Sequence, residues 1–262
     1  MKNLKVYLDS KHEQFNQLGF IKDDPISIPH RFEKKEDIEI IAFFMAIIAW
    51  GQRKSIINSG EKLIQIFNQA PYDFIVNHQE KDLKKCLGFV HRTFNEEDLL
   101  SLIAYIKSLY LSGEGLEFSF SKHLNAKDKN IEKALNGFRM AYEESDFFLN
   151  RTKKHIAYPD GGSACKRLNM YLRWMVRKDK YGVDFGLWNS ISPSQLVCPL
   201  DVHVIKQAHI LGLIDSEKSD WKTAIQLTER LKKFDKSDPV KYDFALFGIG
   251  IDKKNQEFEL PL

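Results

Sequence analysis

The stretch Cys198-Pro199-Leu200-Asp201-Val202-His203-Val204 places an acid two residues after a proline, ahead of a segment that continues to Leu211 and Gly212. Proline suits the first position of a helix, and a carboxylate in the first turn is stabilised by the positive end of the helix dipole. The stretch therefore predicts a helix over residues 199–211 with Asp201 in its first turn. An acid in that place serves more often as a capping group than as a catalyst, so its function depends on what faces it.

The residue expected to face Asp201 comes from the stretch Pro159-Asp160-Gly161-Gly162-Ser163-Ala164-Cys165-Lys166-Arg167-Leu168. We predict a helix over residues 163–177, capped by Ser163, with Lys166 in its first turn. The helix dipole and the adjacent Arg167 disfavour an ammonium there, and an unprotonated amine is a nucleophile. A carboxylate opposite could orient the amine or accept its proton. We therefore expect Lys166 and Asp201 to meet at two facing helix starts.

Helical periodicity dominates the rest of the chain. The segment 36–50 is almost wholly apolar, which indicates a helix at the centre of a core. Asn95 is followed by three acids, which fits an N-cap ahead of a helix over residues 96–111. No stretch alternates over several strands, so a short β element is expected only near the C-terminus. The further helices are expected at residues 4–18, 55–69, 73–79, 131–142, 223–232 and 239–248.

The pattern predicts an all-α fold. The periodicity breaks around residues 144–160, where basic residues gather, and this break suggests a division of the chain. We expect an N-terminal helix and an extended loop over residues 1–35, a central helical subdomain over 36–150, and a hairpin-like and catalytic helical subdomain over 151–262.

Composition narrows the class of partner and the compartment. The 262 residues carry a net charge of +3, with 43% hydrophobic and 29% charged residues, so the chain has the makeup of a globular protein and any binding surface is a local patch. Cys86, Cys165 and Cys198 form no Cys-x-x-Cys pair, which argues against a zinc ribbon or an iron–sulfur cluster and suits a reducing cytoplasm. The N-terminus lacks the apolar run of a signal peptide, and the longest apolar run, residues 38–50, is too short to span a membrane. We expect a cytoplasmic protein without a metal or other cofactor.

Three segments resemble the helix-hairpin-helix DNA glycosylases. The segment 199–212 is similar to their "P-V-D-x-H-V" segment, whose acid is the catalytic aspartate. Residues 160–166 resemble the hairpin whose following helix carries the Schiff-base lysine. The stretch Ile48-Ala49-Trp50-Gly51-Gln52-Arg53 resembles their "L-L-S-x-Q" segment, whose glutamine fills the gap left by a flipped base. The three occur in the family order, within a resemblance that spans roughly residues 36–250 and implies two helical subdomains flanking a cleft.

The chain also departs from the family pattern. Gly161-Gly162-Ser163 stands where most members have a G-x-G hairpin, and Lys166 and Asp201 are 35 residues apart, which is a longer interval than most members have. The long interval resembles archaeal 8-oxoguanine DNA glycosylases of the AGOG type. The iron–sulfur cysteines of the endonuclease III branch are absent. The chain is also similar to a bacterial family of like length with no settled substrate.

The resemblance implies a monomeric, nucleoid-associated enzyme that binds double-stranded DNA and rotates a damaged base into a pocket, with 8-oxoguanine as the lesion favoured by the spacing. Lys166 would attack the sugar and expel the base, and the Schiff base would permit β-elimination, with Asp201 assisting proton transfer. Gln52 would enter the vacated stack, unless it is a polar cap of the apolar helix. The DNA-binding residues would be Gln52, Arg53, Lys54, Gly161, Gly162, Ser163, Lys153 and Lys154, the last two in a patch with Arg151 and His155. The base pocket would hold Trp50, Trp188 and His203.

Each of these roles has a structural alternative. Lys153 and Lys154 could be a solvated charge run, Trp50 a core residue, and His203 a structural residue of the aspartate helix. Three other functions also stay open. The chain could be a non-catalytic protein of the same fold that binds DNA or a nucleotide, a helical scaffold, or a monofunctional glycosylase that uses Asp201 and water.

Overall fold

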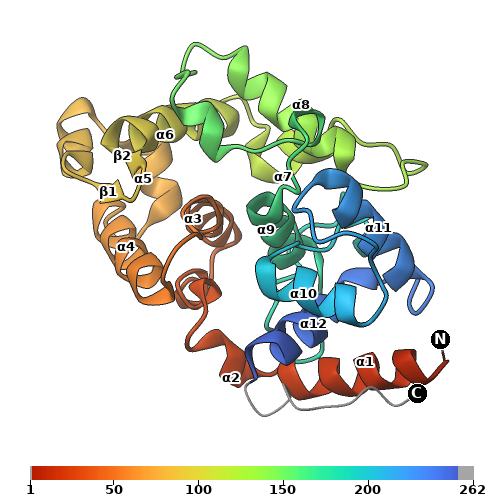
Figure 1. Cartoon of the computed structure of the whole chain (residues 1–262). Helices are drawn as coiled ribbons and strands as arrows, with labels where there is room; N and C mark the ends of the chain where they lie inside the picture. Colours follow the sequence, from red (N-terminus) through yellow and green to blue (C-terminus); the bar gives the residue numbers. More distant parts are fainter. Residues whose placement is uncertain (1, 253–262) are drawn as a thin grey trace.

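The chain folds almost entirely into helices, as Figure 1 shows for the computed structural model, which describes residues 2–252. The all-α prediction is confirmed. The α-helices are α1 (Lys2–Phe15), α2 (Leu18–Ile21), α3 (Lys35–Ile47), α4 (Arg53–Ile66), α5 (Pro71–Asn77), α6 (Glu96–Leu111), α7 (Gly115–Ser121), α8 (Glu132–Glu143), α9 (Lys166–Val176), α10 (Val202–Ile210), α11 (Trp221–Lys232) and α12 (Tyr242–Ile251). The 3-10 turns are η1 (Pro25–Ser27), η2 (Pro29–Arg31), η3 (Glu80–Cys86), η4 (Thr152–His155), η5 (Pro159–Gly161), η6 (Pro193–Gln195) and η7 (Pro239–Lys241).

Two short strands interrupt the helices in the first half of the chain. β1 (Val90–His91) and β2 (Phe94–Asn95) pair antiparallel, with His91 opposite Phe94. The prediction that a β element was possible only near the C-terminus was therefore wrong, because this hairpin lies at residues 90–95. Strands of two residues are too short to show the alternation by which a strand is recognised in a sequence.

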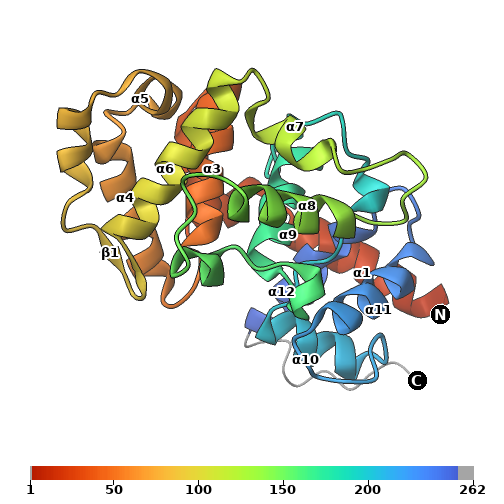
Figure 2. The ribbon, with the colours of Figure 1, turned by 90° about the horizontal axis from the view of Figure 1, so that it is seen from above.

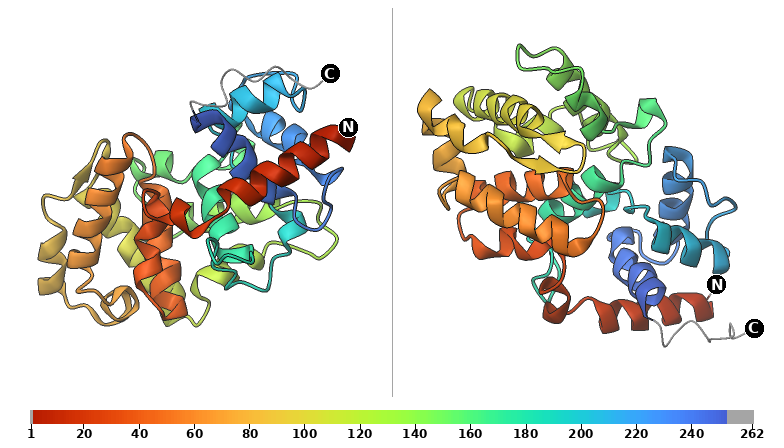
Figure 3. Two further views of the ribbon diagram at one scale, coloured as in Figure 1. Left: turned by 90° about the horizontal axis from the view of Figure 1, so that it is seen from below. Right: turned by 60° about the vertical axis from the view of Figure 1, so that its left-hand side comes forward.

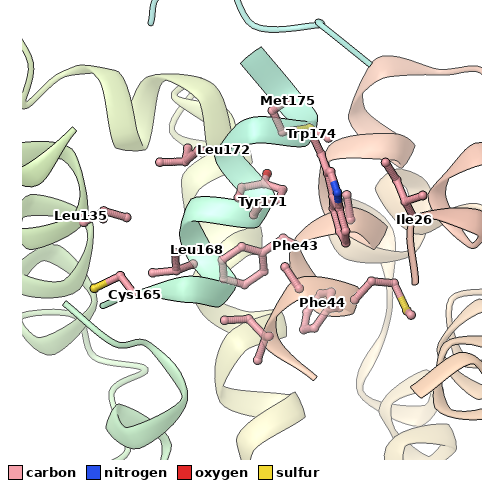
Figure 4. Close-up of a cluster of buried hydrophobic side chains, with 14 of the residues drawn as sticks. Ile26, Phe43, Phe44, Leu135, Cys165, Leu168, Tyr171, Leu172, Trp174 and Met175 are labelled. Carbon is pink, nitrogen blue, oxygen red and sulfur yellow. The ribbon is translucent and has the colours of Figure 1, made fainter. Parts of the chain in front are cut away.

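Helix α3 lies at the centre of the fold, as its apolar sequence predicted. Every residue from Ile38 to Ile47 is buried, and the helix packs against α9. Figure 4 shows Phe43 of α3 close to Tyr171 of α9, with ring centroids 5.6 Å apart and edge to face. Burying a side chain of this size contributes roughly 1.5–3 kcal/mol, so this contact holds the middle of the molecule together.

Two groups of helices flank this centre, and Figure 2 shows them from above. α4, α5, α6 and the β1–β2 hairpin lie on one side, and α10, α11 and α12 lie on the other. α1 packs on α12 although the two are at opposite ends of the chain, as Figure 3 shows. A Cβ at Gly248 of α12 would lie 2.2 Å from the Phe15 ring of α1, so glycine permits this close approach.

Buried ion pairs tie the far end of α9 to the segments around it. Arg173 pairs with Asp184 through Nε at 3.2 Å and with Asp243 of α12 through Nη1. Arg177 pairs with Asp184 at 3.0 Å and with Asp238 at 2.8 Å. Asp184 lies in the loop after α9, Asp238 precedes η7, and Asp243 lies in the first turn of α12, so the network fixes these segments on α9. None of the helices within residues 2–252 is long and apolar enough to cross a membrane.

Candidate active site

A cleft of about 760 Å³ opens between the two groups of helices. Its walls come from the segment around α2 and η1, the loop between α3 and α4, the starts of α9 and α10, and α12. A volume of this size is within the range of sites that enclose a small molecule or a single base. Figure 1 shows α9, α10 and α12, each of which contributes residues to the cleft wall, lying close together.

Lys166 and Asp201 meet in this cleft. The Lys166 Nζ lies 3.3 Å from the Asp201 Oδ2, and both residues line the cavity. The side chain of Lys166 is 40% exposed, whereas that of Asp201 is 11% exposed. The expected meeting of an amine and a carboxylate at two facing helix starts is therefore present, and the amine is open to a ligand.

The two oxygens of Asp201 have different partners. Asp201 is the N-cap of α10, and its Oδ1 accepts hydrogen bonds from the amides of His203 at 2.8 Å and Val204 at 2.9 Å. Its Oδ2 faces Lys166. The predicted helix began at Pro199, but the described helix begins at Val202 because Asp201 itself takes the capping position. The capping bonds fix the carboxylate in place and leave one oxygen for chemistry.

Lys166 is the first residue of α9, which differs from the predicted helix start at Ser163. Cys165 occupies the N-cap position with a φ of +50°, a left-handed backbone that non-glycine residues seldom adopt. The Ser163 Oγ accepts the amide of Cys165 at 3.1 Å and so supports this turn. The buried Asn169 donates to the carbonyl of Ala164 at 3.0 Å. The turn therefore sets the direction in which Lys166 leaves the backbone.

The glycine pair before this turn is only in part available to a phosphate. Gly162 has a φ of +76°, and its amide already donates to the carbonyl of Pro159 at 2.7 Å. The carbonyl of Gly162 accepts the amide of Trp221 at 3.3 Å. The Gly162 amide closes the η5 turn, so it is not free to donate to a phosphate, and the predicted DNA contact of Gly162 would have to use another atom. Gly161 is exposed, and its role stays a prediction.

Two further carboxylates line the cleft, and neither was expected from the sequence. Burial raises the pKa of Asp243 to about 6, against the opposing effect of Arg173, and the nearby Asp201 raises it further. Burial also raises the pKa of Asp24, whose Oδ1 accepts the amide of Ile26 at 3.1 Å at the start of η1. An acid beside the apolar run of α12 was the available signal for Asp243, and an acid before Pro25 was the signal for Asp24.

Trp50 lies in the cleft wall, half-buried. Its ring stacks on His155 with centroids 5.4 Å apart, and the Arg167 guanidinium lies 4.7 Å from its centroid. Arg167 also donates to the carbonyls of Ile47 and His155, the latter at 3.1 Å. Burial lowers the pKa of Arg167 to about 10. Arg167 therefore holds the Trp50 ring in place. Its position beside Lys166 in the sequence did not indicate this contact.

A second aromatic group lines the opposite wall, around Phe247 of α12. The exposed ring of His203 meets Phe247 edge to face at 5.9 Å, and Phe20 meets it at 6.2 Å. The Arg53 guanidinium lies 5.3 Å from the centre of the Phe247 ring. His203 thus lines the cleft, as expected for a pocket residue. Phe247 was missed because an apolar residue in an apolar helix looks like core.

Trp188, by contrast, does not belong to the cleft. Its side chain is 2% exposed, and it packs on Tyr171 and Phe120 in the core. Its Nε1 donates to the Glu39 Oε1 at 2.7 Å, so its polar atom is satisfied within the protein. The prediction of Trp188 as a base-pocket residue was wrong, because the loop that carries it folds onto the buried acid of α3.

The predicted basic patch separates into two parts. Arg151 pairs with Glu97 and with Asp98, the latter at 3.2 Å, and His155 is buried beneath Trp50, where burial lowers its pKa to about 4. These two therefore do not contribute to an open patch. Lys153 and Lys154 are exposed, and among the described residues neither forms an ion pair with a carboxylate.

Arg53 lines the cleft, and Gln52 and Lys54 are its neighbours in the chain. Gln52 is the N-cap residue of α4 without a side-chain capping bond, and Arg53 begins that helix. All three are exposed, and Lys54 has no carboxylate partner within the described chain. Their proposed contacts with DNA stay predictions. In residues 2–252 no group of three or more His, Cys, Asp or Glu side chains is arranged to hold a metal ion.

One family model matches the chain. It is described as "Protein of unknown function (DUF2400)", and it matches residues 24–252, which include every residue of the cleft wall except Phe20. No curated protein and no solved structure matches the chain.

Proposed function

We propose, for a chain that belongs to the DUF2400 family of proteins of unknown function, that it is a base-excision DNA glycosylase with an associated lyase activity. The observation that carries the proposal is the pair of Lys166 Nζ and Asp201 Oδ2, 3.3 Å apart in a cleft that can hold one base. An amine that faces a carboxylate in the wall of such a cleft is equipped for covalent catalysis at a sugar carbon. We infer that the two groups of helices flank the cleft in the manner of the helix-hairpin-helix glycosylases.

The proposed chemistry starts with a proton transfer from Lys166 Nζ to Asp201 Oδ2. The freed lone pair forms a bond to C1′ of the deoxyribose as the C1′–N bond to the base breaks. The base leaves with that electron pair and takes up a proton. In this scheme the departing base receives the proton from Asp201. The carboxylate, whose Oδ1 stays bonded to two helix amides, thereby regains its negative charge as positive charge develops at C1′.

The lyase step follows from the same covalent bond. Loss of the second proton from nitrogen frees an electron pair that forms the iminium at C1′. The C1′–O4′ bond breaks in the same step, and O4′ leaves with that bond's electron pair and takes up a proton. Removal of a C2′ proton then breaks the bond between C3′ and the phosphate oxygen, and the phosphate leaves with that electron pair. Water finally hydrolyses the iminium and restores the free lysine. This sequence requires no cofactor.

The surroundings of the pair support a nucleic-acid substrate. Trp50 and Phe247 present aromatic rings to the cavity, and flat rings are suited to a base that has left its stack. Lys154 lines the cleft, and Lys54 and Lys153 are next in the chain to residues that line it. All three lack carboxylate partners in the described chain and are available to phosphates. The 35-residue interval between Lys166 and Asp201 makes 8-oxoguanine the first lesion to test.

The test is covalent trapping with borohydride on duplexes that carry a panel of damaged bases and an abasic site. We expect wild-type protein to form an adduct on at least one lesion, and Lys166→Ala to form none. Asp201→Asn keeps an oxygen for the helix cap but loses the proton acceptor, so it should slow base release by roughly 10²–10⁴-fold while retaining the fold.

The matched control is Lys206→Ala, which removes an exposed lysine of α10 that does not line the cleft. This variant should trap as well as wild type does. If wild-type protein forms no adduct with any member of the panel, the Schiff-base mechanism is wrong. If Lys166→Ala still releases the base without an adduct, the enzyme instead uses Asp201 and water.

A further inference from the structure

The β1–β2 hairpin lies against the cleft wall but takes no part in the chemistry proposed above. Its two-residue turn, Arg92-Thr93, follows His91, and the hairpin packs on α4. Figure 1 shows it beside α4, on the same side of the molecule as the loop that leads from α3 to α4. Since neither strand contributes a residue to the cavity, the hairpin needs another explanation.

Both strands are fastened to the wall that carries Trp50. In β1, the buried His91 bonds through Nε2 to the carbonyl of Trp50 at 3.1 Å and through Nδ1 to the Ser59 Oγ at 2.9 Å. Because a carbonyl only accepts, Nε2 is the donor and the neutral ring accepts from the serine hydroxyl. In β2, the buried Phe94 packs edge to face on His155, with centroids 5.1 Å apart. His155 in turn stacks on Trp50, so the hairpin is a rigid extension of the cleft wall.

This anchoring presents one cation, Arg92, at the tip. Arg92 is exposed, and in residues 2–252 it has no carboxylate partner. Its φ of +56° is a left-handed conformation that is unfavourable for a bulky residue, and the anchored strands maintain it. Other arginines of the molecule, such as Arg31 and Arg151, are paired with glutamates.

Arg92 also lies against the loop that holds Gln52. A Cβ at Gly51, whose φ is +98°, would lie 3.1 Å from both the Cδ and the Nη1 of Arg92. Glycine at this position therefore leaves room for the arginine side chain. Trp50 and Gly51 line the cleft, whereas Arg92 does not, so the guanidinium lies on the outer side of the same loop.

We propose that the β1–β2 hairpin is a second DNA-contacting element and that Arg92 binds the strand complementary to the one whose nucleotide enters the cleft. This inference rests on the proposed function, since it takes duplex DNA as the substrate. The two strands of a duplex lie side by side, so a strand that delivers a nucleotide past Trp50 places its partner along the outside of that wall. The planar guanidinium of Arg92 suits a phosphate or a base edge there, and no side-chain rearrangement is needed to expose it.

The experiment compares binding to two forms of one strand by fluorescence anisotropy. The strand carries a tetrahydrofuran abasic analogue, which the lyase cannot cleave, and it is used alone and annealed to its complement. The test variant is Arg92→Asn, because asparagine tolerates a positive φ and keeps the turn intact. The control is Arg230→Gln on α11, which removes an exposed arginine without a carboxylate partner among the described residues.

We expect Arg92→Asn to weaken binding to the duplex by about tenfold and to lower the slope of log K against log salt by about 1. Binding to the single strand should match that of wild type, and Arg230→Gln should match wild type with both ligands. Equal affinity of Arg92→Asn and Arg230→Gln for the duplex would overturn the inference. An equal loss with duplex and single strand would also overturn it, because the contact would then not be with the complement.

The same proteins separate this inference from the chemistry. A wild-type protein that traps on borohydride but shows no dependence on Arg92 leaves the glycosylase proposal standing and removes the hairpin contact. A wild-type protein that shows the Arg92-dependent preference for duplex but never traps removes the Schiff-base chemistry and leaves the hairpin contact. A wild-type protein without affinity for the duplex would refute both.

Discussion

The two ends of α9 carry the same kinds of charged groups in opposite settings. At its start, Lys166 has one carboxylate partner, and its side chain is 40% exposed to the cleft. At its end, Arg173 and Arg177 are buried and share four carboxylates, those of Asp179, Asp184, Asp238 and Asp243. The first pair can exchange its partner for a ligand, and the second group cannot. An ion pair on its own therefore does not mark a functional site. Lys166 and Asp201 are candidates because their pair also lines a cleft.

The comparison also separates two ways in which a carboxylate is held. Asp201 is fixed by backbone amides at the start of α10, so its position does not depend on Lys166. Asp184, at 0% side-chain exposure, depends on the two arginines for compensation of its charge. Removing the cation should consequently have different effects at the two ends of the helix.

The largest expected effect is at the buried end. Arg173→Met removes the partner of two buried carboxylates, so we expect the free energy of unfolding to fall by about 3–5 kcal/mol. Chemical denaturation monitored by circular dichroism measures this change. The control is Arg31→Met, which breaks a half-exposed pair with Glu61 and should cost less than about 1 kcal/mol. Equal losses in the two variants would show that the buried network is not what holds α12 on α9.

The stability contributed by Asp243 of that network should depend on pH. Burial raises its folded pKa from 3.8 to about 6, so the folded state holds its proton more tightly than the unfolded chain does. The resulting contribution to stability is complete below pH 3.8 and is lost as the pH rises through 6. We therefore compare the free energy of unfolding of wild type minus that of Asp243→Asn. This difference should decrease between pH 4 and pH 7, by on the order of 2 kcal/mol.

Denaturation at several pH values measures this difference. Burial lowers the pKa of His12 and His155 to about 4, so both histidines also titrate in this window. They are present in both proteins, and their contributions cancel in the difference. A difference that grows as the pH rises from 4 to 7 would mean that the folded pKa of Asp243 is lowered, with Arg173 rather than burial dominating.

The sequence was sufficient for those features that depend on nearby residues. Asn95 accepts the amides of Glu97 and Asp98 in α6, as its place before three acids predicted. The buried helix α3 followed from composition alone, although it ends at Ile47 and not at residue 50. The meeting of Lys166 and Asp201 was predicted because both stand at helix starts, where the backbone limits their direction.

The features that were missed depend on contacts between distant parts of the chain. Trp188 was placed in the pocket because its loop lies between the two site segments, but its position is set by Glu39, 149 residues earlier. Asp243 and Phe247 enter the cleft only because α12 is held by α1 and by Arg173. The hairpin at residues 90–95 is too short for periodicity, and the contact of Arg92 with Gly51 joins two separate loops.

The smallest expected effect on stability is at the open end of α9, where the effect on activity should be greatest. Lys166→Met keeps most of the aliphatic stem and removes the charge from a pair that is partly in solvent, so we expect a change in unfolding free energy below about 1 kcal/mol. In this variant the Asp201 carboxylate is not left without partners. Its Oδ1 remains bonded to α10, and its Oδ2 faces the open cleft, where water can solvate it. Denaturation and borohydride trapping on the same preparation measure the two effects together.

A loss of more than about 2 kcal/mol would assign the pair to the same structural class as Arg173 and its carboxylates, and lost trapping could then reflect unfolding. A near-native stability with no adduct would instead separate the role of the amine in chemistry from any role in the fold.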